Sequence, residues 1–407
     1  MSSIFCRWSG SRLRFLFYLL LLTLAIATVS CSFGPNSGSN TQTTPTHAGP
    51  VNTSKPSGLI QAHGADLVDG TGHAVVLRGA DLESPFIYIK GWNQGKRPTD
   101  LPINQIFTTM AHDWNMNLTR VPISPWIYNQ DTATYMSQLD QYVQTANAAG
   151  LYVVLDMHDD AKAGSPYGNN ATLPKAEDVT FWKAIATHFK DNPMVMFDVY
   201  NEPKAPNWQT WLHGGGTVGG AHVVGFQDLV DAIRSVGAKQ VIVVEPGSAG
   251  GKGAGTGADP NAAAEEGGWS TIGANTINDP NIMYSLHVYQ GIVAPAQVLD
   301  AKWGPILNHY PIFYGEWALL PNGSGKSGIA HCAGIAPGQA DNIVNNFLNY
   351  MASRNASWSA WQFAPHTLVQ DYKTFTPTSL DTQWTCGDQQ ADVGMGALIK
   401  QYLTGGH

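Results

Sequence analysis

The stretch from Met194 to Pro203, MVMFDVYNEP, carries the strongest structural signal in the sequence. Its apolar run, Met194–Tyr200, favours a buried β-strand, and the tripeptide Asn201-Glu202-Pro203 follows directly. A carboxylate therefore stands where a buried strand passes into a loop. In barrels of alternating strands and helices, the carboxyl ends of the strands carry the active-site residues. This stretch predicts a barrel strand with an acid at its end.

Strand and helix signals alternate along the rest of the chain. The eight predicted strands are Val75–Gly79, Leu118–Pro122, Leu151–Asp156, Met194–Tyr200, Gln240–Glu245, Ile282–His287, Ile312–Gly315 and Ser357–Trp361. Amphipathic runs predict helices between them, among them Tyr135–Ala149, Asp178–Lys190, Val224–Val236, Ala296–His309 and Gln339–Met351. Eight such units predict one α/β domain, a (β/α)8 TIM barrel with an N-terminal hairpin and long loops after its strands.

An open, doubly wound sheet is the competing architecture, because it also alternates strands with helices. Such a sheet normally carries a glycine-rich phosphate loop after its first strand. The glycine-rich segment Gly251–Gly257 lacks the strand-turn-helix context of that loop. We therefore favour the barrel and expect Ser248–Thr276 to form a long, mobile loop over its mouth.

Composition argues against one class of partner and favours another. The 407-residue chain has a formal net charge of -8 and only 13% charged residues, so it offers no basic stripe to a nucleic acid. Its 13 Trp, 15 Tyr and 43 Gly residues suit weakly charged loops with aromatic faces, which stack well on neutral sugars. Most tryptophans in proteins are core residues, so this signal is weak by itself.

Residues 1–31 are expected to direct export. Arginines up to Arg14 precede the apolar run Phe15–Val29, which is shorter than the roughly 20 residues of a membrane span and indicates a signal peptide. Thr28-Val29-Ser30-Cys31 resembles a bacterial lipobox, whose cysteine becomes the lipidated first residue. Ordinary cleavage near Ala25-Ile26-Ala27 is the alternative. We expect a cell-surface or extracellular protein that touches the membrane only through lipid on Cys31.

The remaining chain divides into a linker and one catalytic domain. Residues 32–56 consist mainly of Ser, Thr, Asn, Gly and Pro, which predicts a disordered tether. The domain is expected over residues 57–407, and it opens with a hairpin that turns at Asp69-Gly70. In an oxidising compartment Cys332 and Cys386 could form one disulfide between two late loops, and two free thiols are the alternative.

Polar or aromatic side chains stand at the ends of the predicted strands. They are Arg78, Arg120, His158, Glu202, His287, Tyr289, Glu316 and Trp361. Six stretches around them resemble glycoside hydrolase family 5, the cellulase and mannanase family: Asn117–Pro122, Val154–His158, Val199–Pro203, Ser285–Tyr289, Phe313–Trp317 and Trp358–Trp361. Each match alone is weak, but the six follow the order of the family. One departure is Asp81-Leu82-Glu83-Ser84, which stands where many members carry a substrate-binding His or Asn.

The resemblance implies that Glu202 is the general acid/base and Glu316 the nucleophile. Retaining glycosidases work through such a pair when the two carboxyl groups lie about 5–5.5 Å apart. The acid must carry a proton near neutral pH, and we expect a shielded site close to a second carboxylate to favour this. The alternative for either residue is a cap at a helix N-terminus.

The resemblance also implies six supporting residues: Arg120, His158, Asn201, His287, Tyr289 and Trp361. Arg120 and Tyr289 would hold the nucleophile, and Asn201 would bond the 2-hydroxyl of the sugar. The two histidines would hold hydroxyls or the acid, and Trp361 would stack on a sugar face. Each has a structural alternative, namely a core ion pair for Arg120, satisfied core residues for the histidines and plain packing for Trp361.

These inferences lead us to expect a secreted, retaining enzyme that cleaves a β-1,4-linked polysaccharide, with cellulose-type glucan ahead of mannan. A β-mannanase or an exo-acting or β-1,3-glucanase is the alternative within the family. A non-catalytic carbohydrate-binding barrel is the alternative from another class. We expect no cofactor, and no catalytic metal either, because Asp159 and Asp160 beside His158 lack further clustered ligands. We also expect a monomer.

Overall fold

The computed structural model describes residues 55–82, 102–158, 173–218, 221–247, 268–319, 338–380 and 393–405. The chain divides into two units, Met1–Thr44 and Pro45–His407, and all described residues belong to the second. The predictions for the signal peptide, Cys31, the linker up to residue 54, Cys332 and Cys386 lie outside the described residues. Among the helices that are described, none is long and apolar enough to cross a membrane.

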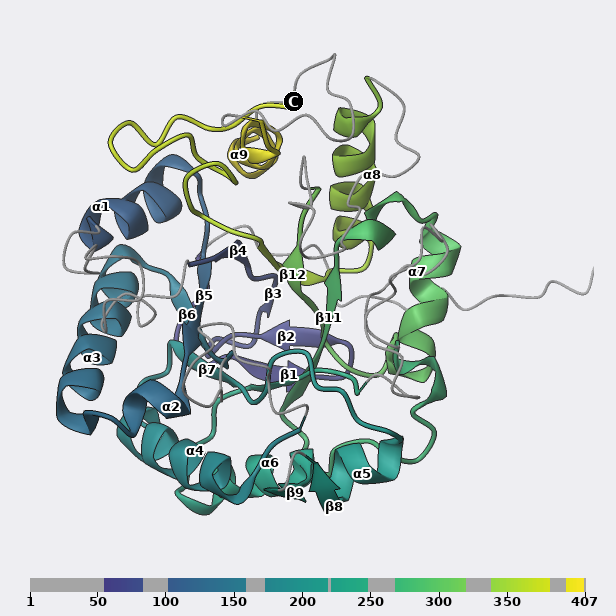
Figure 1. Ribbon diagram of the computed structural model, residues 1–407. Coiled ribbons are helices and arrows are strands. Elements are labelled where there is room, and N and C mark those ends of the chain that lie inside the picture. The colour runs from purple at the N-terminus through teal and green to yellow at the C-terminus, as the bar shows by residue number, and fades with distance from the viewer. Residues whose placement is uncertain are drawn as a thin grey trace, which may run out of the picture. The chain divides into compact units, whose positions relative to one another are not determined.

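Eight parallel strands close into a barrel, so the predicted fold is confirmed (Figure 1). In order around the barrel they are β4 (Arg78–Asp81), β5 (Leu118–Ile123), β6 (Tyr152–Met157), β7 (Val195–Asp198), β10 (Ile242–Val244), β11 (Ile282–Val288), β12 (Ile312–Trp317) and β13 (Ser357–Ala360). Pairing of β13 with β4 completes the circle. Residues of β5 to β13 are buried at every barrel position, which is why their sequences are nearly continuous apolar runs.

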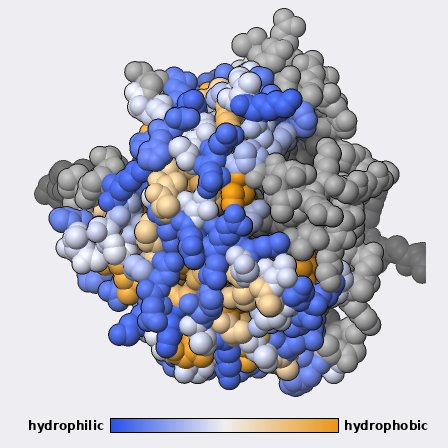
Figure 2. Space-filling view, turned by 90° about the vertical axis from the view of Figure 1, so that its left-hand side faces the viewer, coloured by the Kyte–Doolittle hydropathy of each residue, from blue (hydrophilic) through white to orange (hydrophobic). Residues whose placement is uncertain are grey.

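Helices cover the outside of the barrel (Figure 1). The longer ones are α3 (Thr132–Ala149), α4 (Ala176–Phe189), α6 (Phe226–Ser235), α7 (Ala296–Trp303), α8 (Ala340–Ser353) and α9 (Gly396–Thr404). Shorter ones are α1 (Ile103–Thr108), η2 (Thr109–Asp113), α2 (Pro125–Tyr128), α5 (Trp208–His213), η3 (Trp269–Thr271), η4 (Gln290–Val293) and η5 (Gly304–Ile306). The buried side chains of α3 recur every three or four residues, so one face packs inward. Figure 2 shows the side of the molecule that carries α3, and it is mainly hydrophilic.

Two helices are shorter than the sequence predicts, each for a local reason. The helix expected over Val224–Val236 begins at Phe226, because Val224 ends the strand β9 (Ala221–Val224), which pairs with β8 (Gly214–Val218). The helix expected over Ala296–His309 ends as α7 at Trp303. Gly304 follows with a φ of 51°, in the left-handed region, and a short 3₁₀ turn that contains a proline replaces the rest.

A small antiparallel sheet closes one end of the barrel. It consists of β1 (Gln61–His63), β2 (Asp66–Val68) and β3 (Ala74–Val75), which confirms the predicted hairpin. The first barrel strand begins later than predicted, because Val75 pairs within this sheet and β4 starts at Arg78. Side chains of the small sheet pack in one apolar cluster with residues near the starts of the barrel strands, such as Leu118 and Tyr152. The carboxyl ends of the strands therefore form the open end.

Close contact between β4 and β5 gives a test of the barrel. A Cβ on Gly79 would lie 1.9 Å from the carbonyl oxygen of Leu118, its register partner. Because backbone cannot yield there, Gly79→Ala should lower the free energy of unfolding by about 3 kcal/mol or more in urea denaturation. The control Gly64→Ala has open space but a φ of 60°, and should cost only about 1 kcal/mol. Equal losses in the two variants would contradict this register.

Candidate active site

The carboxyl ends of the strands bring together the two catalytic and six supporting residues predicted for the site. They are Arg120, His158, Asn201, Glu202, His287, Tyr289, Glu316 and Trp361, and each contacts at least one other member. Arg78 is not among them, because it begins β4 and lies over the ring of Tyr402. Parallel strands in a barrel end at one rim, so residues far apart in the sequence meet there. The grouping that the sequence predicted is therefore present, and the individual contacts indicate what each side chain can do.

Glu316 lies on β12, is 3% exposed and has both carboxylate oxygens engaged. Nη1 of Arg120 donates to Oε1 at 2.8 Å, and the hydroxyl of Tyr289 donates to Oε2 at 2.5 Å. Burial, reinforced by the charge of Glu316, raises the pKa of Tyr289 well above its ordinary value, so the phenol remains a donor. The carboxylate is thus held at a fixed angle, as the sequence predicted.

Glu202 follows β7, and its side chain is 34% exposed. Its Oε1 lies 3.1 Å from Nδ1 of His287. Burial raises the pKa of Glu202, but the hydrogen bond and charge of His287 outweigh it and lower the pKa to about 2. The charges of His158 and Lys204 act in the same direction. The expectation that shielding would keep this carboxyl protonated is therefore wrong, because the neighbouring cations dominate.

The Glu202–His287 contact changes where the acidic proton is found. Two ionisable groups in such close contact titrate as a pair, and the proton belongs to the pair rather than to one member. Near neutral pH the proton required of an acid can therefore lie on the imidazole, 3.1 Å from the carboxylate. A general acid at this site would draw on that shared proton.

His287, on β11, connects the pair to a buried acid that the sequence analysis did not select. Its Nε2 lies 3.0 Å from Oε1 of Glu245, which directly follows β10 and is 0% exposed. The other oxygen of Glu245 accepts a hydrogen bond from the backbone N–H of Glu202 at 2.7 Å. One carboxylate thus contacts both members of the pair.

Arg120, on β5, is fully buried among five acids, and we call the six residues the Arg120 cluster. The acids are Asp81, Asp156, Asp198, Glu245 and Glu316, each with an oxygen between 2.8 and 3.2 Å from a guanidinium nitrogen. Nη2 of Arg120 also donates to Oδ1 of Asn201 at 2.9 Å. Burial opposes the positive charge, but the acids, Asp156 and Asp198 foremost, raise the pKa of Arg120 well above its ordinary value. Arg120 is thus both a core ion-pair partner and a contact of Glu316.

Burial acts most clearly on two acids of the Arg120 cluster, Asp81 and Asp198. Burial raises the pKa of Asp81 and Asp198 well above the ordinary value, and the attraction of Arg120 offsets this only in part. The cause is that one guanidinium cannot fully compensate five buried acids.

Sequence analysis missed four acids of this cluster as site residues: Asp81, Asp156, Asp198 and Glu245. A signal was present, because each stands at or just after the carboxyl end of a buried strand. A buried acid in such a place requires a partner. The guanidinium of an arginine suits it well, because its planar group donates several hydrogen bonds to carboxylates. Asp81 also lies in the stretch that departs from the family pattern.

His158 and Trp361 form a stacked pair at the site. Their rings are 5.9 Å apart and inclined by 17°. Nδ1 of His158 lies 2.7 Å from Oδ2 of Asp156, and the imidazole is 25% exposed. Burial works against a charged imidazole, but the carboxylate of Asp156, with a smaller effect of Glu316, raises the pKa of His158 to about 9. His158 is therefore a cation near neutral pH, next to a partly exposed indole.

Three other loop tryptophans that could have formed outer sugar subsites are packing residues instead. Trp208, Trp211 and Trp269 are 9%, 0% and 0% exposed and stack or pack edge-on against each other. Nε1 of Trp211 donates to the backbone oxygen of Glu245 at 2.9 Å. They belong to the apolar core between the barrel and its helices. Their contribution is to support the rim of the barrel.

Glu202, His287 and Glu316 are also a geometrically suitable metal-ligand set. Each offers one atom, and these atoms lie within 4.8 Å of one another. In the described structure the same atoms are engaged with each other or with Tyr289. The absence of a catalytic metal remains a prediction from the sequence.

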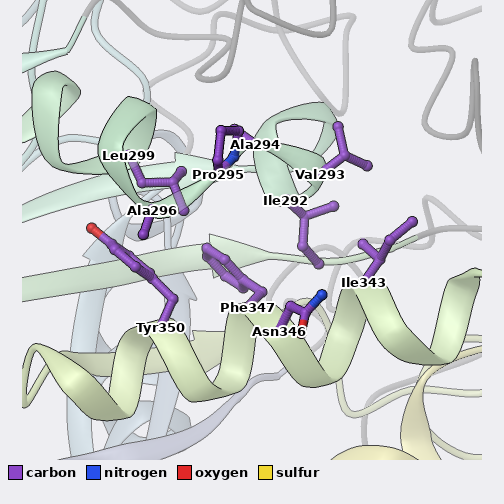
Figure 3. A pocket seen from close by; sticks show the side chains of 10 residues that line it. All are labelled: Ile292, Val293, Ala294, Pro295, Ala296, Leu299, Ile343, Asn346, Phe347 and Tyr350. Atoms are coloured by element: carbon purple, nitrogen blue, oxygen red, sulfur yellow. The ribbon is translucent and has the colours of Figure 1, made fainter.

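An apolar groove lies elsewhere on the molecule, between η4, α7 and α8 (Figure 3). Its volume is about 410 Å³, and Ile292, Leu299, Ile343 and Phe347 are among the residues that line it. The hydroxyl of Tyr350 at its edge donates to Asp300 at 3.0 Å. The groove offers no pair of carboxylates, so hydrolytic chemistry belongs at the rim of the barrel.

A (β/α)8 barrel with two glutamates facing each other at its open end is the arrangement of the barrel glycoside hydrolases. The model of the cellulase family, glycosyl hydrolase family 5, matches residues 68–367. The chain belongs to this family, and the resemblance seen in the sequence is confirmed.

Two curated relatives illustrate the similarity. Endoglucanase E-5 of Thermobifida fusca is 24% identical over 313 residues, which are 75% of this chain and 56% of the relative. Endoglucanase MaCel5A of Microbulbifer sp. (strain ALW1) is 24% identical over 346 residues, which are 84% of this chain and 56% of the relative. The chain thus spans about half the length of these relatives.

Solved structures share the fold. The β-glucanase SdGluc5_26A from Saccharophagus degradans aligns with a TM-score of 0.62 and 20% identity, over 88% of this chain and 97% of that one. The catalytic domain of Thermobifida fusca endoglucanase Cel5A aligns with a TM-score of 0.56 and 20% identity, over 85% and 97%. Both alignments support the barrel architecture.

The elevated pKa of His158 predicts a pH-dependent contribution to stability. Because the pKa is about 9 in the folded protein against 6.5 ordinarily, the charged imidazole stabilises the fold fully below pH 6.5, and this is lost as pH rises through 9. In urea titrations from pH 5 to 10, the stability difference between wild type and His158→Gln should shrink over that window. The exposed histidine of η2 gives the control His112→Gln, expected to change stability by less than about 0.5 kcal/mol. A difference that is constant with pH would contradict the ion pair.

Proposed function

We propose that this chain is a secreted, retaining β-1,4-glucan hydrolase of the endoglucanase type. The main support is the placement of Glu202 and Glu316, whose facing oxygens lie within 4.8 Å of each other and of His287. This spacing agrees with the about 5–5.5 Å of retaining enzymes and is well short of the about 6.5–9.5 Å of inverting ones. Double displacement, in which Glu316 and not a water attacks the sugar, is the mechanism that this spacing supports.

Glu316 is the nucleophile in this proposal. It attacks the anomeric carbon while the bond to the leaving oxygen breaks, and a glycosyl-enzyme forms. Arg120 and Tyr289 hold its two oxygens, which fixes the direction in which the carboxylate can attack. Because both donors are buried, their interactions with the carboxylate are stronger than they would be in water.

Glu202 is the acid in the first step and the base in the second. It delivers to the leaving oxygen the proton that it shares with His287, and later removes a proton from the water that attacks the glycosyl-enzyme. Its partly exposed side chain can reach substrate, whereas Glu316 lies deeper. Asn201 has Oδ1 fixed by Arg120, so its amide Nδ2 is the end available for a sugar 2-hydroxyl. The indole of Trp361, which stacks on His158, offers a flat surface on which the sugar ring can pack.

The relatives support a glucan substrate. Several are named endoglucanases, and two solved structures, a β-glucanase and the Thermobifida fusca Cel5A domain, hold cellotetraose. A non-catalytic sugar-binding barrel is the weaker candidate, because such a protein has no need for two engaged carboxylates.

Export and a lipid anchor on Cys31 are part of the proposal and rest on residues 1–31 alone. Fractionation of cells that express Cys31→Ser tests them, and continued membrane association would exclude the anchor.

Glu316→Ala should abolish turnover, with kcat/KM at least about 10⁴-fold below wild type, since the covalent step is lost. Azide should partly restore activity on an aryl cellobioside, because the small anion can occupy the space of the lost carboxylate. The control Glu177→Ala removes an exposed carboxylate on α4 and should leave activity unchanged. Full activity in Glu316→Ala would rule out its role as nucleophile.

Glu202→Gln should distinguish substrates by their leaving group. On cello-oligosaccharides kcat/KM should fall roughly 10²–10⁴-fold, because the leaving oxygen needs a proton. On 2,4-dinitrophenyl cellobioside the first step should be largely spared, because dinitrophenolate leaves unaided. Equal losses on both substrates would count against the acid role.

A product profile tests the substrate. We expect the protein to release cello-oligosaccharides of mixed length from amorphous cellulose and mixed-linkage glucan, and to act on mannan and xylan at least about 10-fold more slowly. Product chromatography and viscosity measured together separate internal cleavage from release of chain ends. Faster action on mannan, or release of a single short product, would favour the alternative activities.

A further inference from the structure

A fully buried carboxylate lies behind the proposed acid, and the mechanism above does not use it. Glu245 directly follows β10, is 0% exposed and has its backbone oxygen bonded to the Trp211 indole. We propose that Glu245 is a positioning residue for the acid/base step, which fixes the backbone of Glu202 and the imidazole of His287. The inference rests on the proposed function of Glu202.

The first contact fixes the backbone of the acid. Glu202 has a φ of 44°, in the left-handed region, where a residue with a Cβ is strained. Oε2 of Glu245 accepts the N–H of Glu202 at 2.7 Å, a charge-assisted hydrogen bond that stabilises this conformation. Without it, the peptide would be free to relax and carry the carboxyl away from the scissile oxygen.

The second contact fixes the ring that shares the acidic proton. Oε1 of Glu245 lies 3.0 Å from Nε2 of His287, within ion-pair distance of the ring. Nδ1, on the other side of the ring, faces Oε1 of Glu202 at 3.1 Å. Glu245 therefore holds the ring in the orientation in which it can share a proton with Glu202, as a buried acid does for a catalytic histidine.

Only a carboxylate can meet all the contacts at this position. Besides the two donors above, Nη2 of Arg120 lies 3.2 Å from Oε1 of Glu245. The backbone of Glu202 and the guanidinium are N–H donors and a protonated imidazole is a cation, and a carboxylate is the side chain that accepts at both oxygens and carries the opposite charge. A glutamine would turn its NH2 toward one of these donors, which leaves that buried donor without an acceptor.

The charge of Glu245 also favours retention of the shared proton. Five other charged or titratable groups face the pair: Arg120 on β5, His158 after β6, Lys204 after β7, Tyr289 after β11 and Glu316 on β12. Of the groups that face the pair, Glu245 is the acid on the far side of the imidazole from Glu202. Removing its charge weakens the hold on the proton, so the alkaline limb of the pH profile should move to lower pH.

The test is E245Q, assayed on cellotetraose and on 2,4-dinitrophenyl cellobioside across pH 4–10. We expect kcat/KM on cellotetraose to fall about 10²-fold, mostly in kcat, with under about 10-fold loss on the activated substrate. The alkaline limb on cellotetraose should shift by roughly one pH unit to lower pH. A residue that served only the fold would lower both activities equally and leave the limb in place, and that result would overturn the proposal.

Two further variants keep the test decisive if E245Q folds poorly. E245D keeps the charge but is shorter, so it should lose rate while its alkaline limb stays near that of wild type. In the Glu202→Gln background, E245Q should cost little more on cellotetraose, because both changes act on one step. Additive losses would contradict the proposal. D231N, which removes an exposed charge from α6, controls for net charge and should match wild type.

The outcomes separate this inference from the proposed function. If Glu316→Ala and Glu202→Gln behave as expected while E245Q matches wild type in rate and pH profile, only the role of Glu245 fails. If Glu316→Ala keeps full activity, the proposed function itself fails. Thermal unfolding of each variant shows whether a rate loss comes from a folded protein.

Discussion

The buried charge of Arg120 is the constraint on which the open end of the barrel depends. An isolated guanidinium in the core costs several kcal/mol, so the strands around it must supply acceptors. Asp81, Asp156 and Asp198 come from β4, β6 and β7, and Glu316 from β12. The same ion pairs that satisfy Arg120 therefore set the distances between the strand ends. The nucleophile is one corner of this network, so its position is fixed by the fold itself.

The barrel was predictable from sequence because its strands are buried on both faces. The run Met194–Tyr200 is apolar apart from Asp198, which pairs with Arg120, and the polar residues that follow it mark the rim. The predicted and observed boundaries of two elements differ, in each case for a local reason. Val75 pairs in the small antiparallel sheet, so the first barrel strand starts at Arg78. Gly304 ends α7 because its backbone takes the left-handed conformation. The membership of the site was predictable for the same reason, since parallel strands end together.

Charge states and supporting contacts were not predictable, because both depend on residues that are distant in the sequence and meet only in the folded protein. The sequence predicts a protonated Glu202 next to a second carboxylate. The close contact with His287 instead lowers the pKa of Glu202. Glu245 follows an ordinary apolar strand, and no short motif reveals that its oxygens meet the N–H of Glu202 and the ring of His287. Its place after a buried strand indicates that Glu245 needs partners, but which partners it meets is seen only when the strands have been assembled in space.

The small sheet β1–β3 gives the barrel two ends of different character. Its apolar contacts with Leu118 and Tyr152 seal one end, while the charged network occupies the other. Substitutions in the sealed end alter packing without touching the ion pairs around Arg120. Substitutions that increase thermal stability could therefore be placed at that end without changing the catalytic rim. The two ends allow stability and activity to be altered separately.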